Sequence, residues 1–551
     1  MNKANYKQIT CSILTVLLMS VPFVVKAAPA LEKLGVQTDI NGTEKEVAIK
    51  NTTTASKTEN NQIKKFAIGK IIIKSDDIKL KDYSEILEKY ENCQISFAEL
   101  NGLCRILTQD LRSSGYPAAT VYIPPQNIRQ GDALTLAVEP GRYGEISIDN
   151  QSNLNKMIAD GYLAGLKKGK IIRSLELENA IHKLTRVGGI QVAGILSAGK
   201  EVGTTDLTVK IRKGKAATEM LYAENYGTIT AGRYRYGLQG DVQLSEIAGT
   251  LNYALVISNG GQHNYNLGYS QNVGHSATKL GLNISRSDYE LGGIYKMLGA
   301  KGDAFTINLN ATMPLFYTWH DSINLSYGYN YRKLKDEQSN FNLDMKKHSH
   351  SAYVGINGIV RRGKAIFTYD VTDTLGTLGF DNDDARWIYD GADTEDTYNK
   401  TNFNANYLQT FDKHFDVLFK YTGQLANKNL DGSEEIVLGG INGVRAYPTS
   451  FGSGDEGYVA NLEFRYHPHI PGLTLSAYLD TGHVMVTHDS SNASYGGETA
   501  TGWGIGITYT KPNCYFARFD YARRIGGPKY YKTDKDAKDK GRIWFMIGAI
   551  F

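Results

Sequence analysis

A strict two-residue alternation is the feature that most constrains the fold of this chain. From Ile323 to Tyr331 every second residue is Ile, Leu or Tyr, and the residues between them are Asn, Ser or Gly. Such a run is hard to place in a helix, whose side chains repeat every 3.6 residues, and it indicates a β-strand with one apolar and one polar face. Similar alternation recurs at 264–270 and 305–310. These segments suit a wall between lipid and water.

The composition and the chain end favour a membrane β-barrel. A mean hydropathy of −0.34 beside 36 Tyr, 57 Gly and only 12 Pro fits strands that alternate between lipid and lumen. The run 543–551 places Ile543, Phe545, Ile547, Ala549 and Phe551 on one face and ends on Phe551, which predicts a C-terminal barrel assembly signal. The alternative is a soluble all-β domain with one wet face, which shows the same alternation. At about 20 residues for a strand and its connection, residues 216–551 predict an antiparallel transmembrane barrel of about 16 strands.

The first residues predict export. Lys3 and Lys7 precede an apolar run, 9–25, and small residues follow at the position that signal peptidase requires. We therefore interpret 1–27 as a removed secretion signal, the alternative being a retained membrane anchor. Residues 28–65 are rich in Thr, Asn and Lys, and they predict a polar linker with room for one weak plug helix.

Two small α+β modules are predicted between the linker and the barrel. The pattern β-α-α-β-β occurs first over 66–141, including a helix at 97–114 whose residues Leu100, Leu103, Ile106, Leu107 and Leu111 fall at helical spacing. The same order recurs over 142–215. Two similar modules of about 70–75 residues are the economical interpretation.

Three cysteines follow the signal. Cys93 and Cys104 lie close together in a chain that enters an oxidising compartment, which predicts a disulfide between them. The alternative is a pair of buried helix thiols. Cys514 is interpreted as a single thiol of the barrel or of a loop.

The sequence offers no catalytic, cofactor-binding or metal-binding residues. Asp480-Thr-Gly482 matches an aspartic-protease triplet, but a second copy is missing and the alternation assigns Asp480 to a strand. No Gly-Lys pair is followed by Ser or Thr, so a phosphate-binding loop is not expected. The 11 histidines, His348 and His350 among them, show no metal-ligand spacing and are interpreted as solvated or lumen residues. A net charge of +4 does not point to nucleic acid.

One extended block carries a family resemblance. Residues 435–448, read with 454–457 and 462–465, resemble the signature of two-partner (type V) secretion transporters, the haemolysin and haemagglutinin secretion/activation family of Gram-negative bacteria. The resemblance extends along the chain: 115–126 is similar to the first polypeptide-transport-associated (POTRA) domain of that family, 199–207 to the end of the second, and 224–233 to the first barrel hairpin. It implies POTRA 1 over 66–141, POTRA 2 over 142–215 and a barrel over 216–551.

The resemblance also implies a functional site. It places Val444, Arg445, Ala446 and Tyr447 in the sixth extracellular loop, which folds back into the lumen, and pairs Arg445 with Asp480 of a strand motif carried by Tyr478, Asp480 and Gly482. The alternation over 473–480 independently turns Asp480 inward. Ala446 replaces the usual glycine, which requires a backbone without positive φ, and Tyr478 replaces the usual Phe. Because the lumen is expected to be wet, the loss of the pair should cost less than the ~3–5 kcal/mol of a buried pair.

The function implied is transport of a protein across the outer membrane. POTRA domains in the periplasm would capture an unfolded, large secreted exoprotein, of β-helical adhesin or haemolysin type, and the barrel would conduct it to the cell surface without ATP. Outer-membrane lipids and the barrel-assembly machinery are the other expected partners, and nucleic acid is not. The alternatives are a barrel-assembly insertase of the same superfamily, a passive porin, and an outer-membrane enzyme. About 150 residues before the barrel are enough for two modules, whereas an insertase typically carries more.

Overall fold

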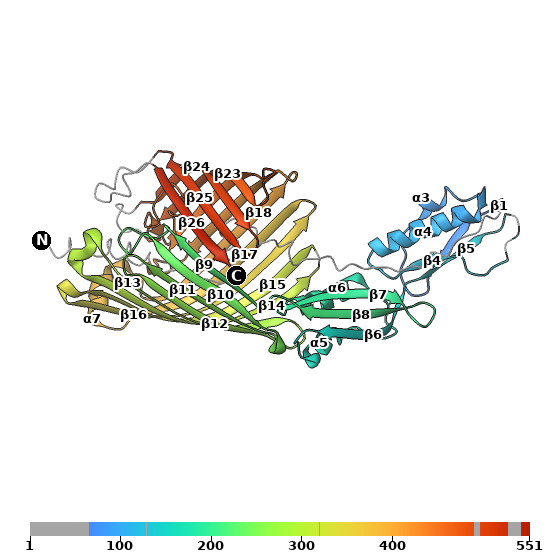
Figure 1. Ribbon diagram of the computed structural model, residues 1–551, viewed down its shortest axis with the longest axis horizontal. Helices are drawn as coiled ribbons and strands as arrows, with labels where there is room; N and C mark the ends of the chain where they lie inside the picture. The colour runs from blue at the N-terminus through green and yellow to red at the C-terminus, as the bar shows by residue number, and fades with distance from the viewer. Residues whose placement is uncertain (1–64, 128, 130, 319, 490–495, 527–540) are drawn as a thin grey trace. The chain divides into compact units, whose positions relative to one another are not determined.

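The computed structural model describes residues 65–551 except 128, 130, 319, 490–495 and 527–540 (Figure 1). The predicted signal, 1–27, and all of the predicted linker except Lys65 lie outside the described residues. The described residues form two compact units, 65–214 and 215–551. Within them, no helix combines the length and the apolar character needed to cross a bilayer.

The first unit contains the predicted repeat of strands and helices (Figure 1). Its first half is built from β1 (Lys65–Ile68), β2 (Ile71–Lys74), α3 (Ser84–Leu87), β3 (Cys93–Ser96), α4 (Phe97–Ser113), β4 (Thr120–Tyr122) and β5 (Leu134–Glu139). Its second half is built from β6 (Arg142–Gln151), α5 (Lys156–Leu163), α6 (Ser174–Thr185), β7 (Ile190–Ala198) and β8 (Thr204–Lys213). The sheets β2-β5-β4 and β6-β8-β7 share one topology. The central strand, β5 or β8, is parallel to the first strand of its sheet in the chain, β2 or β6, and antiparallel to the other neighbour, β4 or β7.

Helix α4 shows why the sequence folds locally as it does. Ser96 and Glu99 form a capping box that satisfies free N–H groups at the helix start. Leu103 and Leu107 are fully buried in the core of the first half, whereas Ile106 is 47% exposed. Ile106 therefore does not share this apolar face, because it directly precedes Leu107 and is turned about 100° from it around the helix axis.

The predicted disulfide is not formed in the structure. Cys93, at the start of β3, is exposed, and Cys104, in α4, is buried in the apolar core; both are free thiols, as is the exposed Cys514. The prediction rested on short sequence separation. The two side chains instead face different environments, because Cys104 faces the core with Leu103 and Leu107 while Cys93 contacts the carbonyl of Tyr90.

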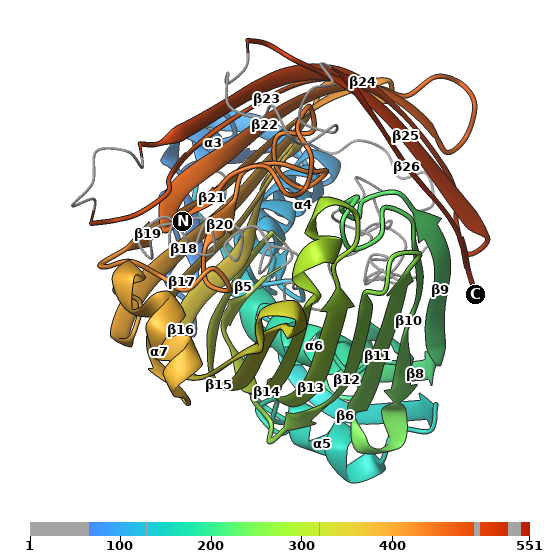
Figure 2. The same ribbon diagram turned by 90° about the vertical axis from the view of Figure 1, so that its left-hand side faces the viewer.

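The second unit is a closed antiparallel barrel of 16 strands, which confirms the predicted fold and strand number (Figure 2). The strands are β9 (Ala217–Glu224), β10 (Arg235–Leu244), β11 (Gly249–Ser258), β12 (His263–Val273), β13 (Thr278–Glu290), β14 (Ala300–Tyr317), β15 (Asp321–Gln338), β16 (Leu343–Arg362), β17 (Ala365–Phe380), β18 (Asp396–Thr410), β19 (Phe415–Ala426), β22 (Glu456–Tyr466), β23 (Leu473–Met485), β24 (Glu498–Lys511), β25 (Tyr515–Arg524) and β26 (Gly541–Ile550). Strand β26 closes the ring on β9 through five residue pairs, and Phe551 extends the ladder by exchanging main-chain hydrogen bonds with Glu219.

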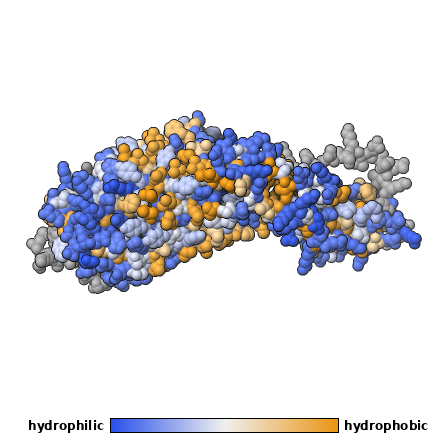
Figure 3. Space-filling model, turned by 90° about the horizontal axis from the view of Figure 1, so that it is seen from below, coloured by the Kyte–Doolittle hydropathy of each residue, from blue (hydrophilic) through white to orange (hydrophobic). Residues whose placement is uncertain are grey.

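The barrel wall has an apolar outer face. Leu309, Leu479 and Ile505 point outward and are about half exposed, at 52%, 52% and 54%. Hydrophobic side chains gather over the middle of the barrel face seen in Figure 3, and hydrophilic ones lie beyond them toward the end that carries α7 (Asp383–Tyr389). This band is the surface that a bilayer covers.

Short elements lie in the connections between the long strands. They are the 3-10 helices η2 (Ser245–Ile247), η3 (Gly293–Leu298), η4 (Ser339–Phe341) and η5 (Asp390–Ala392), the helix α7, and the two-residue strands β20 (Ile436–Val437) and β21 (Ser453–Gly454). Strands β20 and β21 pair with each other inside the connection from β19 to β22, residues 427–455. We call this connection the lumen loop (Figure 2).

Candidate functional site

The lumen loop is a folded element. Its chain turns back on itself through hydrogen bonds from Val444 N to the Leu438 carbonyl (2.8 Å) and from Gly440 N to the Tyr447 carbonyl (3.1 Å). Leu438, Val444 and Tyr447 are at most 1% exposed and pack with apolar residues of β22, β23, β24 and β25. The loop therefore presents Arg445 from a packed apolar base.

Arg445 is bound by the barrel wall through a bidentate ion pair. Its Nε and Nη2 donate to the two carboxylate oxygens of Asp480 at 2.8 Å each, and its main-chain N donates to Asp480 at 3.1 Å. Nη1 donates to Glu463 of β22 at 2.8 Å. The planar guanidinium fork matches a carboxylate in this geometry, which a lysine cannot reproduce.

Three further residues complete this tip cluster, which we define as Arg445, Asn461, Glu463, Tyr478, Asp480 and Trp544. The guanidinium carbon of Arg445 lies 3.2 Å from the centre of the Tyr478 ring. Trp544 of β26 donates to the Arg445 carbonyl at 2.7 Å, and Asn461 of β22 donates to Asp480 at 2.9 Å and to the Gly443 carbonyl at 3.1 Å. The loop tip is thus fixed to β22, β23 and β26 at once.

Burial of the tip cluster corrects the expectation of a wet lumen at this point. Arg445 is 4% exposed and Asp480 is 1% exposed. An ion pair removed from water to this degree leaves an uncompensated charge when one partner is lost, and the penalty is then ~3–5 kcal/mol. The loss of one partner should therefore cost more than the sequence predicted.

The two departures from the family motif are accommodated by nearby glycines. The φ angle of Ala446 is not positive, so alanine fits the backbone, and its methyl group packs directly against Gly502 of β24, where any Cβ would clash with it. Likewise the Tyr478 ring lies over Gly504, where a Cβ would clash with the ring. At Gly482 a Cβ would come within 2.7 Å of the Leu438 side chain, so the absence of a side chain at this position allows the lumen loop to pack closely against β23.

A second charged group binds the beginning of the loop to other strands of the wall. This stem cluster comprises Arg332, Lys347, Lys400, Asp431 and Glu434. Lys347 of β16 donates to Asp431 at 2.6 Å, with both side chains buried, and its ammonium lies 4.1 Å from the centre of the Tyr389 ring in α7. Glu434 binds Lys400 of β18 at 2.6 Å and also pairs with Arg332 of β15.

The sequence analysis predicted that Val444–Tyr447 lie near Tyr478, Asp480 and Gly482. It did not predict the other residues of the tip and stem clusters. Inward alternation was the available signal for Glu463, which lies opposite Tyr478 in register, and for Asn461, which lies opposite Asp480. The pairings of the stem cluster carried no local signal, because the partners are 34 to 102 residues apart in the chain.

A closed barrel with a lumen loop anchored on two sides, preceded by two α+β modules, defines an outer-membrane polypeptide transporter of the POTRA class. The profile of the haemolysin secretion/activation proteins ShlB/FhaC/HecB matches residues 203–509, over half of the chain, and that of the ShlB-type POTRA domain matches residues 66–141. The chain belongs to the haemolysin secretion/activation family. It is an outer-membrane transporter of two-partner secretion, with its POTRA region in the periplasm.

Individual relatives agree with this assignment. The heme/hemopexin transporter protein HuxB of Haemophilus influenzae (strain 86-028NP) is 25% identical over 490 residues, which cover 87% of this chain and 85% of the relative. The outer membrane transporter CdiB of Dickeya dadantii (strain 3937) is 21% identical over 78% of this chain and 77% of its own. Among solved structures, CdiB from Escherichia coli has the same fold, with a TM-score of 0.69 at 17% identity, over 100% of this chain and 99% of that chain.

Proposed function

We propose that this chain captures one unfolded secreted protein in the periplasm and conducts it through the barrel lumen to the cell surface without ATP. The secreted partner is a large exoprotein of the β-helical adhesin or haemolysin type. The names of the relatives include a heme/hemopexin transporter and a hemolysin transporter, and both support a protein cargo for this chain. The chain acts as a transporter and not as an enzyme.

The observation that carries this proposal is a row of neutral polar side chains on the lumen wall. Asn283 donates to Asn308 at 3.3 Å, Asn308 to Asn330 at 2.6 Å, and Asn330 to Ser351 at 3.2 Å, so a row of amides and a hydroxyl runs across β13 to β16. Such groups can form hydrogen bonds with any extended main chain, and they do not select for charged side chains on the polypeptide that passes. An unfolded polypeptide of mixed sequence can therefore slide past them.

The second module offers a place for capture. Strand β6 is an edge of the sheet β6-β8-β7, and beside it lies a groove of about 380 Å³ lined by Ile146, Ser147, Ile148, Lys156, Asp160, Leu163 and Ala164. An extended segment can add to such an edge through main-chain hydrogen bonds, which are largely independent of sequence, while the groove receives alternate side chains. Capture by strand addition fits a carrier that meets its cargo before it folds.

The C-terminal strand supports two further parts of the proposal. Ile543, Ile547 and Phe551 are outward and are 59%, 46% and 64% exposed, so they face outer-membrane lipids. A final apolar strand that ends in Phe is the segment that the barrel-assembly machinery recognises during insertion.

Comparative proteomics of the native bacterium tests the transport proposal. The extracellular and surface proteomes are measured with the gene, without it, and with the gene restored. We expect the loss of one large secreted protein while other outer-membrane barrels keep their abundance. An unchanged secretome with depleted barrels would instead identify an insertase and refute the proposal.

A further inference from the structure

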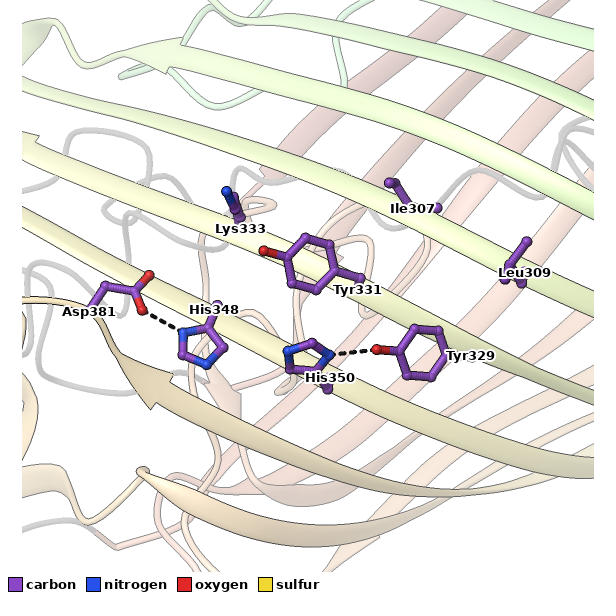
Figure 4. Close-up of a pocket in the computed structure, with 8 residues that line it drawn as sticks. All are labelled: Ile307, Leu309, Tyr329, Tyr331, Lys333, His348, His350 and Asp381. Atoms are coloured by element: carbon purple, nitrogen blue, oxygen red, sulfur yellow. Dashed lines mark hydrogen bonds and ion pairs between the residues drawn. The ribbon is translucent and has the colours of Figure 1, made fainter.

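A recess on the outer wall of the barrel has no part in the transport site. It lies over β14, β15 and β16, has a volume of about 750 Å³, and is lined by Ile307, Leu309, Tyr329, Tyr331, Lys333, His348, His350 and Asp381 (Figure 4). These side chains point away from the lumen, because their neighbours on the same strands, Arg332 and Lys347, bind the lumen loop. The histidines therefore face the membrane side and not the lumen.

The recess lies at the upper edge of the lipid-facing band. On β15 the outward residues are apolar or aromatic from Ile323 to Tyr331, and Lys333 follows as the first outward charge toward the cell surface. Nine residues of strand span about 26 Å, or roughly 20 Å along the normal of a barrel with tilted strands, which is close to the height of a lipid-facing band. The recess is thus level with the headgroups of the outer leaflet.

Polarity changes along the recess in the direction of the membrane normal. Its upper end carries Lys333, His348 and Asp381, with His348 Nδ1 2.5 Å from a carboxylate oxygen of Asp381. His350 lies between the two ends; its ring is tilted by 41° against that of Tyr331, with ring centres 4.9 Å apart, and its Nδ1 is 2.5 Å from the Tyr329 hydroxyl. The lower end is formed by the apolar side chains of Ile307 and Leu309 (Figure 4). A ligand that fits this gradient has a polar headgroup above and acyl chains below.

Lys333 is the group of the recess that can pair with an anion, because the Asp381 carboxylate is already in contact with His348. The neighbouring outward cations of the same rim are paired: Arg286 with Asp303 at 2.8 Å, Lys301 with Glu290 at 3.4 Å, and Lys335 with Glu337 at 3.2 Å. Among the described residues, Lys333 contacts no carboxylate within ion-pair distance, and its side chain is exposed. An ammonium group at a bilayer surface without a protein partner attracts a phosphate.

We propose that this recess binds one phosphorylated glycolipid of the outer leaflet. A phosphate of the headgroup pairs with Lys333, the His348 and His350 imidazoles and the Tyr331 ring contact the sugar, and an acyl chain lies along Ile307 and Leu309. The aromatic face suits a sugar ring, and the amphipathic gradient favours a lipid over a free phosphate ion. The bound lipid would fix the outer leaflet to β14–β16, the strands that hold part of the stem cluster.

Native mass spectrometry of the full chain in detergent tests the proposal. The probes are bis-phosphorylated lipid A, its dephosphorylated form, and phosphatidylglycerol. We expect a one-to-one adduct with phosphorylated lipid A, and an affinity about tenfold lower for the Lys333→Ala variant. Lys335→Ala is the matched control, because Lys335 lies two residues further on the same face but is already paired, and its affinity should stay within about twofold of the parent.

Two results would overturn the proposal. Equal affinities of Lys333→Ala and Lys335→Ala for lipid A would show that this recess is not the binding site. Equal binding of the dephosphorylated lipid or of phosphatidylglycerol would show that the recess does not recognise a phosphorylated sugar headgroup. Both variants change exposed residues, so the folded barrel is retained and the comparison stays valid.

Discussion

At the scale of single residues, the tip cluster depends on one arginine with several partners. Arg445 contacts Asp480, Glu463 and the Tyr478 ring, and its carbonyl accepts from Trp544. Its removal leaves the buried Asp480 carboxylate and the Glu463 carboxylate without their shared guanidinium partner. Lysine keeps the charge but loses the fork, so it is an informative second substitution.

Arg445→Ala should undock the loop tip without unfolding the barrel. The loss of a buried partner destabilises the docked loop by ~3–5 kcal/mol, so we expect secretion to fall by more than about tenfold. Secretion by Arg445→Lys should lie between that of the parent and that of Arg445→Ala. Secretion is measured from the culture supernatant, and folding from the heat-dependent mobility of the barrel on semi-native gels. Normal secretion by Arg445→Ala would contradict the role assigned to this pair.

The contact between Ala446 and Gly502 makes a second prediction. Gly502→Ala places two methyl groups in the same space, and overpacking of this kind costs about 1–3 kcal/mol. We expect a lower melting temperature and reduced secretion, both restored by the double variant Ala446→Gly/Gly502→Ala. Gly391→Ala is the control, because a Cβ there meets open space. Failure of the double variant to recover would rule out this packing as the reason for the glycine.

The cysteines give a third prediction. Burial raises the pKa of the Cys104 thiol, which lowers its thiolate fraction, and the side chain is also shielded from solvent. In the folded chain a maleimide should therefore modify Cys93 and Cys514 but leave Cys104 until denaturant is added. Peptide mapping under non-reducing conditions provides the check. A Cys93–Cys104 linkage in protein purified from the outer membrane would contradict the structure.

At the scale of elements, the lumen loop is held at two separate places on the barrel wall. The stem cluster binds it to β15, β16 and β18, and the tip cluster binds it to β22, β23 and β26. A loop that is fixed at two places is held rigidly inside the barrel, and the release of one place leaves the other attached. Each anchor can therefore be tested separately by its effect on the width of the lumen.

Lys347→Met should release the stem. It leaves Asp431 buried without its ammonium partner, which costs ~3–5 kcal/mol, whereas Lys347→Met/Asp431→Leu removes both charges and should cost less. We expect larger and more frequent conductance steps in planar bilayers for the single variant than for the double one. Lys413→Met, in an exposed turn, serves as the control. Identical traces for Lys347→Met and its control would exclude a stem anchor.

At the scale of the whole molecule, periodicity predicted most of the fold. The two-residue alternation over Ile323–Tyr331 and the helical spacing over Leu100–Leu111 can be recognised in one sequence, because each reflects which face of the element is buried. The first segment lies in β15 and the second in α4. The strands β1 and β3 were not predicted, because their four residues include no run of β-branched side chains like that of β2 (Ile71–Lys74).

The site was predictable only where a motif marked it. Arg445 and Asp480 lie in such motifs, and their contact is formed. Lys347 and Asp431 carry no motif, and their pairing depends on the path of the lumen loop across the barrel, which no local pattern encodes. The disulfide prediction was overturned for the same reason, since sequence separation between Cys93 and Cys104 says nothing about which way each side chain faces.

Passage of a polypeptide through the lumen is the central claim, and site-specific photo-crosslinking in living cells tests it most directly. A photoreactive phenylalanine replaces Asn406, on the lumen side of β18, or the adjacent Tyr407, which faces lipid and is 40% exposed. The account predicts an adduct between position 406 and one large secreted protein, with none from position 407. Absence of a secreted-protein adduct at 406 while that protein is being exported, or equal adducts at both positions, would contradict transport through this barrel.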